Sequence, residues 1–229
     1  MQLPSDLEPA RIVRRLTRFT VEVDLRDKLV PVHLANSGRV EELLTLGSAA
    51  LVAPAGGPSR RTHYDLVLVR AGASWVSADA RLPNLLVQEA LEQRRIPALD
   101  SFTELQREVR VGACRIDFRL SGQAGACLLE VKSMTLVEAG VALFPDAPSA
   151  RAVRQLSVLA EACQRGDAAC VLFVVQRGDA EALTPNEALD SAFAAALRAA
   201  AAVGVTLLAY RCNVAPYCIK LSDAIPVLL

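Results

Sequence analysis

The chain has 229 residues, of which 52% are hydrophobic and 22% charged, and its 25 basic and 25 acidic side chains give a formal net charge of zero. A chain of this length and composition can bury one large core or two modest ones, which excludes disordered and fibrous proteins. No apolar run approaches the roughly 18 residues of a membrane span, and the N-terminal segment lacks the apolar stretch of a signal peptide. We therefore expect a soluble, cytoplasmic protein without a membrane partner.

The zero net charge gives no long-range attraction to nucleic acid, so any such attraction must come from local clusters of basic residues. Two clusters occur, one in the N-terminal segment and one after a Pro/Gly loop: Arg11, Arg14, Arg15 and Arg18, then Arg60 and Arg61. They are candidates for phosphate binding, and a solvated basic face is the alternative. The six cysteines form no C-x-x-C pair, which favours reduced, buried thiols over zinc ligands or disulfides.

Short segments rich in β-branched residues, separated by Gly/Pro/Asn turns, dominate the chain up to about residue 82. They are expected strands, with a short helix over 39–47 that ends at Gly47: 19–25, 29–34, 48–54, 64–71 and 74–80. Five short strands of this kind predict a small barrel or sandwich. We assign residues 1–82 to this N-terminal domain.

The pattern changes at residue 83, from where strands alternate with helices. Helices are expected over 84–94, 149–165 and 186–203, and strands over 107–120, 126–137, 169–177 and 205–212. Alternation of this kind predicts an α/β domain with a mixed sheet, residues 83–229, so the whole chain is expected to be α+β.

One predicted hairpin keeps three charged residues in an otherwise apolar setting. If its turn is centred on Gln123 and Ala124, Asp117 lies directly opposite Glu130, and Lys132 shares a face with Glu130. Like charges directly opposed on neighbouring strands are destabilising, so a counter-charge is expected between them.

A divalent cation would supply that counter-charge. Two converging carboxylates, Asp117 and Glu130, offer the oxygen ligands that Mg²⁺ or Mn²⁺ prefers. Lys132 would then orient or deprotonate water, or stabilise charge on a phosphate. Glu108, nine residues before Asp117, is a candidate additional catalytic acid. The alternative is a charge cluster at a sheet edge, neutralised by Lys132 and nearby arginines.

Two further segments are candidates for contact with nucleic acid. The segment "FPDAPSARAVRQL" predicts a turn, with Asp146 as a turn residue, followed by a helix with Ser149 as N-cap. Its first turns carry Arg151, Arg154 and Gln155, which would bind phosphate or belong to an ordinary amphipathic helix. The segment "HLANSGR" offers Asn36 and Arg39 to a phosphate, or is a capped strand-to-helix turn.

The sequence resembles the sugar fermentation stimulation protein A (SfsA) family over nearly its whole length. The phrases that carry the resemblance occur in the family's order: "HLANSGRVEELL", "WVSADARLPNLLVQEAL", "REVRVGACRIDF", "LLEVKSMTLVEAGVALFPDAPSARAVRQL" and "FVVQRGDA". The resemblance implies an OB-fold-like N-terminal domain and a C-terminal domain of the PD-(D/E)xK, restriction-endonuclease-like type. It also implies DNA binding and a metal-dependent nuclease site, with Asp117, Glu130 and Lys132 as the signature residues and Glu108 as the upstream acid.

The sequence departs from the family pattern just after "FPDAP". Arg151 is kept, but Ala152, Arg154 and Gln155 stand where the family usually has Gly, Lys and His, and Cys114 replaces a usual Ser. Because of these differences, the rate and substrate preference of relatives are not carried over to this chain.

Two readings of the function follow. The first is a magnesium- or manganese-dependent hydrolase that cleaves DNA or RNA. In this reading the N-terminal domain binds the phosphates of the strand through Arg15, Arg18, Arg60 and Arg61. The second is a non-catalytic DNA-binding regulator of sugar (maltose) utilisation genes, as the family name suggests, although no helix-turn-helix or other base-reading motif is present. A carbohydrate-binding module is a weaker third reading, since only 4% of the residues are aromatic. The sequence does not distinguish DNA from RNA as the partner, and a homodimer is one option for the oligomeric state.

Overall fold

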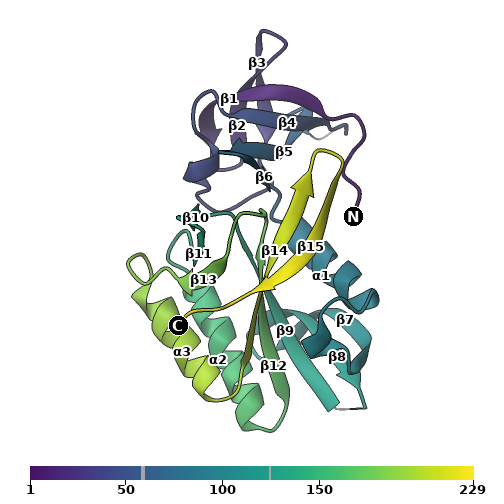
Figure 1. Ribbon diagram of the computed structural model, residues 1–229, viewed down its shortest axis with the longest axis vertical. Coiled ribbons are helices and arrows are strands. Elements are labelled where there is room, and N and C mark those ends of the chain that lie inside the picture. Colours follow the sequence, from purple (N-terminus) through teal and green to yellow (C-terminus); the bar gives the residue numbers. More distant parts are fainter. Residues whose placement is uncertain (58–59, 124) are drawn as a thin grey trace.

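A barrel domain and a sheet-and-helix domain follow one another along the chain (Figure 1). The computed structural model describes residues 1–57, 60–123 and 125–229. The expected hairpin turn at Gln123 and Ala124 and the Pro/Gly loop before Arg60 thus fall partly outside the described residues.

The N-terminal domain is built from six strands. Their bounds are β1 Glu8–Thr17, β2 Thr20–Leu25, β3 Lys28–His33, β4 Ala49–Pro54, β5 Tyr64–Ala71 and β6 Ser74–Ser77. The strand order is β3-β2-β1-β4-β5-β6, and a parallel bridge between His33 of β3 and Asp65 of β5 closes the first five strands into a barrel. The predicted small barrel is thereby confirmed.

Two local predictions in this domain were wrong. Strand β1 was read as a basic segment, because register shifts after Ile12 and after Arg15 break the alternation by which a strand is recognised. The helix expected over 39–47 is a single 3₁₀ turn, Glu41–Leu43, preceded by Val40 in the left-handed region with φ 44°.

The C-terminal domain is a six-stranded mixed sheet with helices on both faces. Its strands lie in the order β15-β14-β12-β9-β8-β7: β7 Phe102–Val111, β8 Cys114–Gly122, β9 Gly125–Met134, β12 Ala168–Val175, β14 Thr206–Ala215 and β15 Cys218–Ile225. Neighbours β9, β12 and β14 are parallel, and the outer pairs are antiparallel. This confirms the mixed sheet predicted from the alternation of strands and helices.

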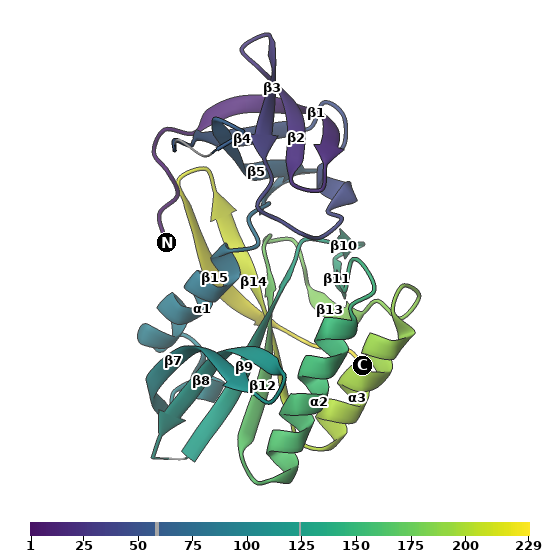
Figure 2. The same cartoon turned by 180° about the vertical axis from the view of Figure 1, so that it is seen from behind.

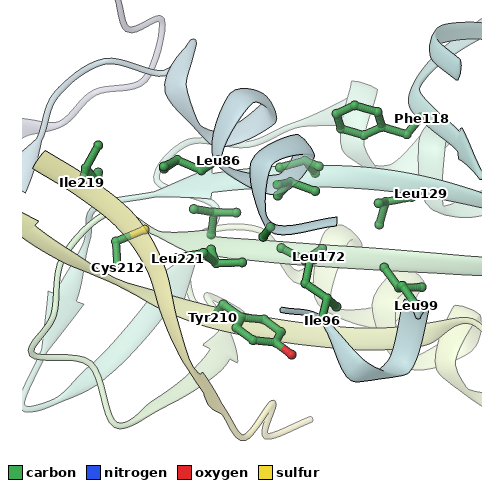
Figure 3. Close-up of a cluster of buried hydrophobic side chains, with 14 of the residues drawn as sticks. Leu86, Ile96, Leu99, Phe118, Leu129, Leu172, Tyr210, Cys212, Ile219 and Leu221 are labelled. Atoms are coloured by element: carbon green, nitrogen blue, oxygen red, sulfur yellow. The ribbon is translucent and has the colours of Figure 1, made fainter. Parts of the chain in front are cut away.

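Helix α1 (Leu82–Glu92) lies on one face of this sheet, and α2 (Ala150–Gln164) and α3 (Ser191–Ala202) lie together on the other (Figures 1 and 2). The apolar residues divide accordingly. One buried cluster joins α1 to the sheet and includes Leu86, Phe118, Leu129 and Leu172 (Figure 3). A second cluster fills the space under α2 and α3, and a third fills the barrel.

Three features of the C-terminal domain differ from expectation. The strand expected over 107–120 is two strands, β7 and β8, with Gly112 in the left-handed region between them. Strand β15 and the small sheet of β10 (Val137–Glu138), β11 (Val141–Phe144) and β13 (Ala182–Pro185) were not predicted. Helix α3 starts five residues later than expected, because Asp190 caps it.

The remaining structural facts concern thiols and membranes. All six cysteines are free; Cys127, Cys170 and Cys212 are buried as predicted, whereas the other three are partly exposed. Burial raises the pKa of Cys127 and of Cys212 to about 12. Among the described residues, none of the helices has the length and apolar character needed to cross a membrane.

Candidate nuclease site

The hairpin of β8 and β9 brings the three signature residues together. Its pairs run from Gly122 with Gly125 to Phe118 with Leu129, which is the predicted register. The regular pairing ends there. The next residue, Asp117, instead directs its carboxylate to the backbone of β9, and its Oδ2 accepts a hydrogen bond of 2.9 Å from the amide of Val131.

Helix α1, which covers one face of the sheet, also fixes the side chain of Asp117. Nδ2 of Asn84, in the first turn of α1, donates to Oδ1 of Asp117 at 3.0 Å. Each carboxylate oxygen therefore has one fixed donor and keeps a further lone pair. Asp117 is thus oriented before any ligand arrives.

Glu130 and Lys132 form a buried ion pair, as their predicted common face requires. Nζ of Lys132 lies 2.7 Å from Oε1 of Glu130 and 2.7 Å from Oε1 of Gln155 on α2. The side chains of Lys132 and Glu130 are only 9% and 3% exposed. Gln155 in turn donates from Nε2 to the carbonyl of Arg115, which fixes the amide between the sheet and the helix.

The second oxygen of Glu130, Oε2, is buried and has no hydrogen-bond partner among the described residues. Burial is the main cause that raises the pKa of Glu130; Lys132 opposes the rise and the charge of Asp117 adds to it. A buried carboxylate oxygen without a donor is destabilising. A cation beside it would remove that cost.

The site opens into a polar cavity of ≈ 350 Å³. Its walls come from β8 and β9, the N-terminal ends of α1 and α2, and Ser37 and Ala80 of the barrel domain. The lining residues that carry the chemistry are Asp117, Glu130, Lys132, Asn84, Arg151 and Gln155. Space for a phosphate group therefore lies directly beside the carboxylates.

The residues present fit a magnesium or manganese ion of the type that uses few protein ligands. Within residues 1–57, 60–123 and 125–229, no cluster of three or more His, Cys, Asp or Glu side chains is suited to hold a metal. Mg²⁺, however, is commonly bound through one or two carboxylates, with waters and substrate phosphate completing its shell. Asp117 and Glu130 meet that requirement.

Three other predicted residues lie in different surroundings. Glu108 lies outside the cavity, 59% exposed, with its carboxylate 3.5 Å from Arg115. Arg154 is exposed on α2 and does not line the cavity, whereas Arg151, one turn earlier, does. Gln155 is 2% exposed, so it contacts Lys132 rather than solvent.

The loop of residues 36–40 is held from both domains. Arg15 donates to the carbonyls of Gly38 and Arg39, and Arg18 donates to the carbonyl of Ser37 at 3.0 Å. From the other domain, Oδ2 of Asp146 accepts from the amide of Arg39 at 2.8 Å. The two N-terminal arginines are therefore engaged in holding this loop.

Asn36 and Asp146 complete the attachment of the loop. Asn36 is buried, donates to the carbonyl of Ala78 and accepts from the amide of Gly38 at 2.8 Å, which is the capped turn weighed as its alternative role. Asp146 also accepts from the amide of Val40 at 3.4 Å, so this turn residue connects the two domains. The side chain of Arg39 remains exposed.

A second polar cavity, of ≈ 440 Å³, opens on the barrel. Arg60 and Arg61 line it, as do His33 and Arg81, and Phe19 is 43% exposed at its wall. Arg60 pairs with Asp65, and Arg81 pairs with Asp79 at 2.6 Å. Arginines and an exposed aromatic ring are the components of a surface for single-stranded nucleic acid.

Asn84, Arg81 and Phe19 were not singled out from the sequence. Asn84 precedes Asp117 by 33 positions and sits on a different element, so no local spacing connects them. A polar residue at the start of an otherwise amphipathic helix is the only signal it gives.

Two sequence profiles match the chain. The profile described as "SfsA N-terminal OB domain" matches residues 13–78, and the one described as "Sugar fermentation stimulation protein RE domain" matches residues 81–217. The two profiles divide the chain where the barrel ends and α1 begins.

Relatives of known sequence and structure agree. The sugar fermentation stimulation protein homologue of Geobacter metallireducens is 41% identical over 232 residues, which cover 100% of both chains. That of Chloroflexus aggregans is 42% identical over 96% of this chain and 85% of its own. The solved structure of Pyrococcus furiosus SfsA in complex with Ca²⁺ has a TM-score of 0.91 and 26% identity, and covers 100% of this chain and 98% of its own. The chain belongs to the sugar fermentation stimulation protein (SfsA) family.

Proposed function

We propose that this protein binds DNA or RNA and hydrolyses phosphodiester bonds with the help of Mg²⁺ or Mn²⁺. The observation that carries the proposal is Oε2 of Glu130, which no described residue donates to and which is buried beside Asp117 and Lys132, next to an open polar cavity. Structural charge clusters normally satisfy such an oxygen internally. A cation held by Asp117 and Glu130 would satisfy it here.

The residues have separable roles in this proposal. Asp117 and Glu130 would hold the cation, which when bound polarises the phosphate and the attacking water. Asn84 and the amide of Val131 keep Asp117 in its orientation. Lys132, held by Gln155, would donate to a phosphate oxygen, where negative charge develops as water adds to phosphorus and the ester oxygen leaves.

The barrel domain would bind the nucleic-acid strand. An OB-type barrel commonly binds single strands, and the cavity with Arg60, Arg61 and Arg81 has the charge that a phosphate backbone requires. Arg151, at the mouth of the cavity that contains Lys132, would contact the phosphate next to the reacting one. The Ca²⁺ named for the Pyrococcus furiosus structure is, like Mg²⁺, a cation that prefers oxygen ligands, which supports the choice of metal.

Metal binding is testable without turnover. Ca²⁺ or Mg²⁺ at about 100 times its dissociation constant should raise the stability of the wild-type protein by about 2.7 kcal/mol. Asp117→Asn should lose most of this increase, measured by thermal unfolding with and without EDTA. The exposed Asp223, paired with Arg211, provides the control Asp223→Asn, which should keep the increase. Equal stabilisation of Asp117→Asn and wild type would contradict a metal at this site.

A further inference from the structure

A third, smaller cavity lies between the two domains and shares a wall with the cavity that contains Lys132. It measures ≈ 180 Å³, and its two sides are the loop 36–40 of the barrel domain and the segments 133–136 and 143–146 of the C-terminal domain. Four residues line both cavities: Ser37, Ala80, Ser133 and Phe144. We call it the interdomain slot.

The lining of the slot is more apolar than polar, and its polar residues are Asn36, Ser37, Ser133, Thr135 and Asp146. Val40, Met134, Leu136, Leu143 and Phe144 contribute the apolar surface. The hydroxyl of Ser133 accepts a hydrogen bond of 3.0 Å from Gln176 and keeps its own proton free to donate. Apolar faces with a few polar groups at the edge complement a flat heteroaromatic ring.

The slot is formed in advance. Its barrel side is the loop that Arg15, Arg18 and Asp146 hold in place. On its other side, the aromatic ring of Phe144 packs edge-on against Phe173 at 5.7 Å and Phe193 at 5.0 Å between ring centroids. Walls fixed in this way keep the cavity open, so binding a ring there costs little ordering of the protein.

The size of the slot suits one aromatic base. An engineered apolar cavity of about 150 Å³ in another protein binds benzene, and the slot at ≈ 180 Å³ is slightly larger. Ala80 and Ser133 line both the slot and the neighbouring cavity, where the proposed site would hold a phosphate.

We propose that the interdomain slot holds the nucleobase of a nucleotide next to the phosphate bound beside Lys132. This inference rests on the proposed function. A base between the two domains cannot remain stacked in a duplex, so the substrate would be single-stranded or would have that nucleotide turned out of the stack.

Binding of a single-stranded DNA oligonucleotide in Ca²⁺, with one abasic nucleotide moved along the strand, tests the proposal. The wild-type protein should lose about tenfold in affinity when the base that occupies the slot is missing, since each stacked base contributes about 1–3 kcal/mol. In Leu136→Trp, which fills the slot from a residue that does not line the cavity of Lys132, the intact strand should bind about tenfold more weakly. The abasic position should then make no further difference.

The matched control is Leu85→Trp, at an exposed position on α1 that lines neither cavity. It should reproduce the wild-type pattern. An abasic scan that is flat in the wild-type protein, or that is the same in Leu136→Trp as in wild type, would overturn the proposal. If no strand binds with or without Ca²⁺, the proposed function itself fails, and the slot fails with it.

Discussion

Glu130 and Glu42 carry carboxyl groups whose charged form is disfavoured by burial. Glu130 has Lys132 as a partner, and its second oxygen has no partner in the described part of the chain, which fits a role in binding a cation. Glu42 lies near the interdomain slot, and its Oε1 accepts a hydrogen bond of 2.7 Å from the hydroxyl of Thr135. Burial is the main cause that raises the pKa of Glu42, and the charge of Asp146 also raises it, while Thr135 and Arg177 oppose the rise.

The raised pKa of Glu42 makes its effect on stability depend on pH. Because the folded protein binds the proton of Glu42 more tightly than the unfolded chain does, the group stabilises the fold fully below its pKa in the unfolded chain. That contribution is lost as pH rises through the folded pKa. Glu42→Gln, which keeps an acceptor for Thr135, should therefore raise the melting temperature relative to wild type more at pH 8 than at pH 4.

The exposed neighbour Glu41 provides the charge-matched control for this comparison, Glu41→Gln. Melting temperatures of the three proteins at several pH values give the required differences. If the difference between Glu42→Gln and wild type stays constant across the range, the carboxyl group of Glu42 is not destabilised by burial in the fold.

At the scale of single residues, the signature acids and lysine could be predicted because they follow from strand alternation and a short hairpin. The register that the Gly-bounded turn predicted is the observed one from Phe118 to Gly122. The local pattern could not show that the regular strand pairing ends before Asp117, whose carboxylate accepts a hydrogen bond from the amide of Val131. The orientation of this carboxylate also depends on Asn84, which lies on another element. Likewise, Gln155 was predicted to bind phosphate or to belong to an ordinary amphipathic helix, and the helix pattern alone could not show that it is buried against Lys132.

At the scale of elements, the ends of helices α2 and α3 are coupled by one carboxylate. Oδ1 of Asp190 accepts from the amide of Phe193 at 2.9 Å and so caps α3, while its Oδ2 accepts from the amide of Ser149 at 2.8 Å. Ser149 itself caps α2, as the sequence predicted, by accepting from the amide of Ala152. The first turn of α2 carries Arg151, so this arrangement fixes a wall of the candidate site.

Asp190→Ala should lower the free energy of unfolding by about 1–2 kcal/mol, because an N-cap acceptor is lost at a buried position. Urea denaturation measures the change. Asp190→Asn, which keeps one oxygen acceptor, should recover most of the loss because Asn caps helices about as well as Asp. A difference below a few tenths of a kcal/mol for Asp190→Ala would show that the cap contributes little.

The elements that could not be predicted are those that depend on distant partners. Strand β15 pairs with β14 and, through a single bridge at Cys218, with Gln2 near the N-terminus, and the two-residue β10 is too short to show any period. Strand β1 is interrupted by two register shifts. In contrast, the parallel strand β12, buried along nearly its whole length, has the continuous apolar run that makes such strands easy to recognise.

At the scale of the whole molecule, the candidate site is an interdomain feature. Ser37 and Ala80 of the barrel domain line the same cavity as Lys132, and Asp146 joins the loop 36–40 to the C-terminal domain. Asp146→Ala would leave the amides of Arg39 and Val40 without their acceptor. Their hydrogen exchange should accelerate about tenfold or more, since a charge-assisted hydrogen bond contributes about 1.5–3 kcal/mol.

Asp146→Asn, which retains an oxygen acceptor, is the control for that measurement and should accelerate the two amides less. Exchange in the barrel core, for example at Val23, should be unchanged in both variants. Unaltered exchange at Arg39 and Val40 in Asp146→Ala would mean that Asp146 contributes little to holding the loop.

The most direct test of the account is cleavage by the purified protein of labelled single- and double-stranded DNA and RNA, in Mg²⁺, Mn²⁺ or EDTA, beside Asp117→Asn and Lys132→Ala. We expect cleavage that requires the metal, disappears in both variants and leaves nucleic-acid binding by Lys132→Ala largely intact. Binding without cleavage under every metal condition would contradict the nuclease assignment and favour a non-catalytic DNA-binding role. Full cleavage by Lys132→Ala would contradict the role given to the lysine.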